Sequence, residues 1–219
     1  MREEGPVPER PQPLRVGYHQ QLDALGATVT RLFALVTEGV AAASQALMAD
    51  DAEARAAVLA GEETVDELMV QLEADIERVL LLQAPVAGAL RWVLVLVRIV
   101  PQLERSGDLA VHIANRAGTG LVEGLPPAAR GILERMGETA VQLWRGAADG
   151  FAERDPDAGP RLEREDDVLD ELHRQLTEQL VRGDLDPGVA AEAALVARFY
   201  ERLGDHAVHI ATRISDAVR

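Results

Sequence analysis

The chain contains nearly the same segment twice. Residues 104–116 read ERSGDLAVHIANR and residues 201–213 read ERLGDHAVHIATR, so ten of thirteen positions are identical at an offset of 97 residues. A chain of 219 residues is long enough for two domains of about 100 residues each. The repeat therefore predicts a tandem duplication, and it marks the segment in which the two copies diverged least.

Apolar residues recur at spacings of three and four along most of the chain, which is typical of amphipathic helices. No run of alternating β-branched residues predicts a strand. We expect an all-α fold of two three-helix bundles in tandem, related by the duplication, at residues 16–120 and 125–219, after a proline-rich disordered tail at residues 1–15. The six predicted helices span residues 18–49, 52–82, 86–117, 128–154, 161–181 and 188–218.

Composition excludes several classes of function. The net charge is −15 and the chain has no lysine, so we expect neither nucleic acid nor an anionic membrane surface as a partner. The absence of cysteine rules out disulfides and thiolate metal sites and suits a cytoplasmic protein. The most apolar region, residues 79–103, is interrupted by arginine and proline, so we expect no insertion into a membrane.

Each half carries two acidic pairs with a spacing of four residues, which places both carboxylates of a pair on one helix face. Helices joined by a short turn pack as antiparallel neighbours, so each half can bring four carboxylates to one site. The pairs are Glu62 with Asp66 and Glu104 with Asp108 in the first half, and Asp166 with Asp170 and Glu201 with Asp205 in the second.

Oxygen-rich clusters of this kind suit magnesium, manganese and iron. His112 and His209 follow the second acid of each repeated segment by four residues, and an imidazole there would favour iron, zinc, manganese or nickel. The alternative for the acids is ion pairing with neighbouring arginines, and for the histidines it is a structural hydrogen bond. Unpaired acids beside valine and alanine are costly, which favours a cation site.

Gly107 and Gly204 stand within predicted helices beside the acids, where glycine costs about 1 kcal/mol relative to alanine. They indicate either a close approach of the neighbouring helix at a metal site or ordinary tight packing. Pro101 should kink its helix, whereas its counterpart Arg198 should not, so we expect the two sites to differ. No catalytic motif is present; Asp170-x-x-His173 is the nearest approach to the Glu-x-x-His spacing of di-iron oxidases.

The two repeated segments resemble the signature of the PhoU family, which reads ERIGD-H-A-x-N-I-A, and the acidic pairs upstream match as well. The resemblance covers residues 16–219 and implies two three-helix bundles. It implies a cytoplasmic, non-enzymatic negative regulator of the phosphate-starvation response, which links the phosphate ABC transporter to a sensor histidine kinase. Some members bind iron or zinc clusters through these acidic pairs, which implies one metal site in each half.

The chain departs from the family signature at three positions. His112 and His209 stand where the family commonly has asparagine, and Leu109 replaces a common histidine that the second half retains as His206. Metal identity and the equivalence of the two sites therefore stay open. We also expect a homodimer. Two other functions stay open: a carboxylate-bridged metal-dependent oxidase or hydrolase, and a helical scaffold without metal.

Overall fold

The computed structural model describes residues 14–219, with side chains from residue 20 onward. The described residues form helices and no strand, so the predicted all-α fold is confirmed. The predicted disordered tail lies outside the described residues, apart from positions 14 and 15, which already belong to the first helix. The helices are α1 (Leu14–Ala49), α2 (Ala52–Gln83), α3 (Ala87–Ala114), α4 (Leu121–Gly124), α5 (Pro127–Glu153), α6 (Ala158–Arg182) and α7 (Pro187–Val218).

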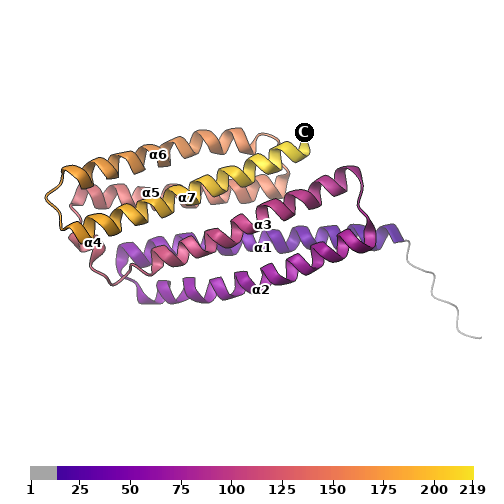
Figure 1. Ribbon diagram of the computed structural model, residues 1–219, viewed down its shortest axis with the longest axis horizontal. Helices are drawn as coiled ribbons and strands as arrows, with labels where there is room; N and C mark the ends of the chain where they lie inside the picture. Colours follow the sequence, from indigo (N-terminus) through magenta and orange to yellow (C-terminus); the bar gives the residue numbers. More distant parts are fainter. Residues whose placement is uncertain (1–13) are drawn as a thin grey trace, which may run out of the picture.

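The six long helices of the described residues form two bundles that lie side by side (Figure 1). The first bundle comprises α1, α2 and α3, and the second comprises α5, α6 and α7, with α1 packed on α5 and α3 packed on α7. The buried apolar side chains of both bundles form one continuous core. The division into domains at residues 16–120 and 125–219 stays a prediction, because this shared core couples the two halves.

Local sequence features explain where helices begin. The Asp51 carboxylate accepts hydrogen bonds from two backbone N–H groups at the start of α2, and Asp186 does the same for α7, which satisfies donors that have no partner within the helix. Proline occupies an early position of α5 and α7, where its missing N–H costs nothing. Pro101 lies inside α3, and the helix continues through it.

Polar contacts also join the two bundles. The hydroxyl groups of Ser44 on α1 and Tyr200 on α7 are 2.9 Å apart. Within the second bundle, the Trp144 indole N–H on α5 donates to the Leu203 carbonyl on α7 at 3.0 Å, so this buried polar group is paired. The Trp144 ring also lies 6.2 Å from the Phe33 ring on α1. The bundles are therefore held together by specific contacts as well as by apolar burial.

One stretch of the described residues, Gln20–Ala49 in α1, is long and apolar enough to cross a membrane by length and composition. This stretch differs from residues 79–103, which the sequence pattern indicates as the most apolar region. In the structure, Leu25, Val29 and Val36 of α1 are buried in the core. The hydropathy of α1 is thus accounted for by its place in the bundle, where it contacts α2, α3 and α5.

Candidate functional site

The first acidic set lies where α2 passes α3. Glu62 is half-buried, and burial is the main reason that its pKa is raised above the usual range; the nearby Asp66 and Asp108 carboxylates raise it further. Glu104 is exposed and is not among the groups that act on Glu62. Asp66 and Asp108 are therefore the predicted acids of this half that act most strongly on Glu62.

The second acidic set, where α6 passes α7, is more complete. Burial and the carboxylates of Asp170, Asp205 and Glu201 raise the pKa of Asp166 to about 7. The pKa of Glu201 is also raised, first by burial and then by Asp205. All four predicted acids of this half thus interact electrostatically. Burial together with this mutual repulsion means that the set binds a proton or another cation more readily than isolated acids do.

Asp166 has a buried carboxylate oxygen without a partner. Its Oδ1 atom is buried and has no hydrogen-bond partner, which is costly for a carboxylate oxygen. The absence of a side chain at Gly204 creates its position, because a Cβ there would lie 2.2 Å from Asp166 Oδ1. In the first half, a Cβ at Gly107 would meet only Val65, at 3.9 Å. The close approach predicted at both glycines is thus tight at Gly204 and ordinary at Gly107.

The two sets also differ in their basic neighbours. Arg198 forms an ion pair with Glu201 from one helical turn away. The repeat places Pro101 at the position equivalent to Arg198, so Glu104 has no arginine at that position. His173 on α6 also favours the charged form of Glu201. The sequence pattern assigns no role to His173, although its spacing of three residues from Asp170 is visible in the sequence.

The histidines predicted as possible ligands lie on another face. The exposed His112 stacks on Phe199 of α7, with ring centroids 5.5 Å apart, and the exposed His209 lines a groove between α3 and α7. Neither histidine appears among the causes of the pKa shifts of Glu62, Asp166 or Glu201. Both histidines therefore lie along the interface between α3 and α7, where the two bundles meet.

The carboxylate oxygens of both sets are suitable ligands for a cation, but their side chains are not arranged around a common point. Carboxylate oxygens are suitable ligands for hard and borderline metal ions, and Asp166 supplies one with no other partner. Among the described residues, however, no three His, Asp or Glu side chains converge on a common point at ligand distance. A metal ion would need the carboxylates to rotate toward one another.

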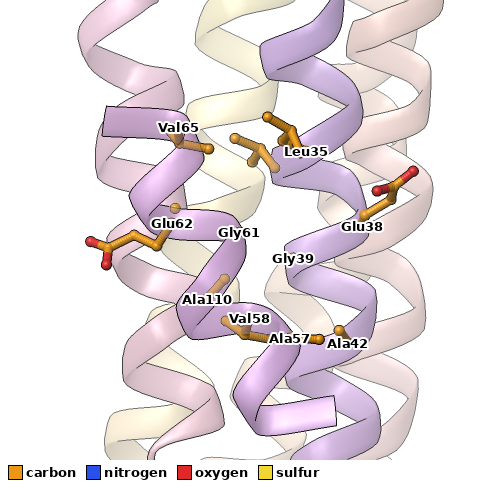
Figure 2. Close-up of a pocket in the computed structure, with 12 residues that line it drawn as sticks. Leu35, Glu38, Gly39, Ala42, Ala57, Val58, Gly61, Glu62, Val65 and Ala110 are labelled. Carbon is orange, nitrogen blue, oxygen red and sulfur yellow. The ribbon is translucent and has the colours of Figure 1, made fainter. Parts of the chain in front are cut away.

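A small cavity of about 140 Å³ lies beside the first acidic set, between α1 and α2 (Figure 2). Its walls are mostly small and apolar residues, including Gly39, Gly61 and, from α3, Ala110, with Glu38 and Glu62 at the lining as well. Figure 2 shows the Glu62 carboxylate pointing away from this cavity. The cavity is therefore a packing gap between helices and does not extend the acidic set.

The fold and both repeats match known proteins. The PhoU domain model matches residues 29–117 and again residues 133–214. A relative from Mycobacterium leprae, the phosphate-specific transport system accessory protein PhoU homolog 1, is 34% identical over 204 residues, which cover 92% of this chain and 92% of that relative. The Thermotoga maritima PhoU homolog 1 is 27% identical over 203 residues, which cover 91% of this chain and 88% of that relative.

Solved structures agree with these matches. The crystal structure of PhoU from Pseudomonas aeruginosa superposes with a TM-score of 0.86 at 25% identity, covering 92% of this chain and 99% of that one. The PhoU structure from Streptococcus pneumoniae, at 20% identity and a TM-score of 0.80, shares the fold over 92% of this chain and 96% of its own. With two PhoU domains and relatives along almost its whole length, this chain belongs to the PhoU family.

Proposed function

We propose that this protein is a negative regulator of the phosphate-starvation response that works by binding partners. The observation that carries the proposal is the match to accessory proteins of the phosphate-specific transport system over 92% of the chain. Those relatives support a role in regulating phosphate transport. The finer proposal is an adaptor in the cytoplasm that links the phosphate ABC transporter to a sensor histidine kinase and has no catalytic step of its own.

Binding to the transporter and the kinase can be tested directly. The tagged protein is captured from cells grown in high and in low phosphate, and the membrane fraction is probed for both partners. We expect both to be recovered in high phosphate, when signalling is kept off. Recovery of neither under any phosphate level would contradict the adaptor role. Recovery of the transporter alone would contradict only the link to the kinase.

We further propose that the two acidic sets bind metal ions, with iron or zinc first and manganese, magnesium or nickel as alternatives. In the first half the ligands would be Glu62, Asp66, Glu104 and Asp108, and in the second half Asp166, Asp170, Glu201 and Asp205. The support comes from the recurrence of these acids in both repeats, the raised pKa of Glu62 and Asp166, and the unpaired oxygen of Asp166. A bound metal ion would neutralise the repulsion between these carboxylates.

Metal content of protein purified without chelator tests this proposal. The double variant Asp108→Ala plus Asp205→Ala removes one acid from each set, on α3 and α7. The control, Glu73→Ala plus Glu163→Ala, removes two exposed acids from α2 and α6, the helices that carry the other acids of the two sets. We expect metal in the wild type and in the control, and loss in the first variant. Equal, near-zero metal in all three would favour a scaffold whose acids serve only in ion pairs. Metal with hydrolytic or redox turnover would favour the enzyme alternative.

We also propose that the protein is a homodimer. The last turn of α2 and its connection to α3 expose three large apolar side chains, Leu81, Leu82 and Val86, each at least 70% exposed. Exposed apolar clusters at one tip are typical of protein interfaces. Light scattering of the wild type and of Leu82→Glu tests this directly, with a dimer expected for the first and a monomer for the second. A monomeric wild type at all concentrations would contradict the proposal.

A further inference from the structure

α3 and α7 run antiparallel along the seam between the two bundles (Figure 1). Residues later in α3 therefore contact residues earlier in α7. The contacts that fix this register are Ser106 with His206, His112 with Phe199, and Arg116 with Glu192. Because α3 and α7 carry the duplicated segment, the two ends of the seam are equivalent positions of the repeat and can be compared directly.

At one end of the seam, the basic side chains contact other groups of the protein. The His112 ring stacks on Phe199, and the guanidinium carbon of Arg116 lies 5.0 Å from the centre of the same ring. Arg116 also forms an ion pair with Glu192 at 3.1 Å and donates a hydrogen bond to the His112 carbonyl. Both basic residues thus contact other protein groups, and this end is filled.

At the other end, the equivalent positions hold His209 and Arg213, and Gln102 stands where the filled end has Phe199. With Arg98, these residues line a groove of about 350 Å³. Among the described residues, neither Arg98 nor Arg213 forms an ion pair with a carboxylate, and neither donates a hydrogen bond to another protein group. The groove therefore presents two unengaged guanidinium groups in a protein of net charge −15.

The same groove also contains unsatisfied acceptors. The Gln102 side-chain oxygen is buried and has no hydrogen-bond partner. Pro101 has no N–H, so the Val97 carbonyl, one turn earlier on α3, lacks its usual helical donor. Both residues line the groove. A ligand that satisfies this lining must be negatively charged for the arginines and must also carry a hydrogen-bond donor for these acceptors.

We propose that the groove binds inorganic phosphate as a protonated oxyanion. Its charged oxygens would accept from Arg98, Arg213 and a ring N–H of His209, since guanidinium groups match phosphate geometry. Its P–OH group would donate to the Gln102 oxygen. Sulfate has the same shape but carries no proton at neutral pH, so it should bind more weakly. The inference stands on the groove alone and does not depend on metal at the acidic sets.

Equilibrium dialysis with radiolabelled phosphate tests the inference on the full chain after chelator treatment. We expect saturable binding to the wild type that excess sulfate displaces poorly. Arg213→Gln should weaken binding about tenfold or more, since a hydrogen bond to a charged group contributes roughly 1.5–3 kcal/mol. Arg116→Gln, at the equivalent position of the filled end, is the matched control and should bind as the wild type does.

A second variant guards against loss of binding through misfolding. Gln102→Phe places in the groove the residue that fills the other end, so it should keep the fold and lose phosphate. Absence of binding to the wild type would overturn the inference, as would equal binding by Arg213→Gln and Arg116→Gln. Loss of phosphate binding in Asp108→Ala plus Asp205→Ala would also overturn it, because phosphate would then be held through residual metal at the acidic sets.

Discussion

Ser106 and His206 meet where α3 crosses α7, with the hydroxyl oxygen 2.9 Å from Nδ1 of the imidazole. The Ser106 hydroxyl donates its one proton to the Gln102 carbonyl at 2.7 Å, so it accepts from the Nδ1–H of His206. Burial, followed by the Arg202 charge, lowers the pKa of His206 to about 4. The imidazole is therefore neutral at neutral pH and serves as a buried link between the two bundles.

Removing the serine should leave this buried donor unpaired. We expect Ser106→Ala to lower the free energy of unfolding by about 1–3 kcal/mol. The repeat offers a control, because the equivalent positions of the two copies are Leu203 and Leu109. Ser106→Ala combined with His206→Leu removes both polar partners and should cost less than Ser106→Ala alone. Denaturant titration measures both; a double variant less stable than the single one would contradict this account.

Gly204 and Gly107 are equivalent in the repeat but should respond oppositely to alanine. A Cβ at Gly204 would lie 2.2 Å from Asp166 Oδ1 and 2.7 Å from Leu169 Cδ2, so Gly204→Ala must displace both side chains. We expect a net loss of about 1–3 kcal/mol, typical of overpacking. Gly107→Ala meets only ordinary contact and should gain up to about 1 kcal/mol from helix propensity. Urea unfolding compares them, and equal effects would contradict the asymmetry.

The long helices were predictable because their signals are local. Three- and four-residue apolar spacing defined six helices whose ends fall within four residues of those observed, and the repeat defined the duplication. The sequence did not predict α4, which occupies the glycine- and proline-rich linker. A single turn leaves too short a pattern to recognise, and the turn begins after Gly120, whose positive φ of 76° is a conformation that favours glycine.

The acidic sites were predictable in composition but not in detail. Four-residue spacing places two acids on one helix face, but it does not fix how that face is rotated toward the neighbouring helix. Glu104 is therefore not among the main influences on the pKa of Glu62, while Asp166 lies close to Gly204. The Arg198–Glu201 pair and the approach of His173 depend on side-chain rotamers and on the α6–α7 packing. Such features follow from tertiary structure alone.

Asp166 should make the metal-free protein less stable as the pH rises. Its pKa is raised to about 7 from 3.8, so the folded state holds a proton that the unfolded chain has released, and this stabilisation is lost between about pH 4 and about pH 7. Asp166→Asn cannot titrate. Its stability relative to the wild type should therefore increase with pH, by at most about 1.4 kcal/mol per pH unit and by less because water screens the half-buried carboxylate.

Denaturant titrations of chelator-treated protein across this pH range measure the effect. Glu163→Gln, an exposed acid on the same helix, is the control and should follow the wild type at every pH. The expectation concerns the difference between Asp166→Asn and the wild type, because His206, with its lowered pKa, contributes a slope of opposite sign to both proteins. A constant difference across the range would show that Asp166 ionises normally.

Arg198 should weaken metal binding at the second acidic set. Its ion pair with Glu201 competes with any cation for that carboxylate, and the first set has Pro101 at the equivalent position. In an Asp108→Ala background, which disables the first set, we expect Arg198→Gln to raise zinc affinity up to about fivefold, because a partly exposed ion pair contributes up to about 1 kcal/mol. Arg164→Gln removes a nearby exposed charge from α6 and controls for the general field. An equal gain in both variants would assign the effect to net charge and not to the Glu201 pair.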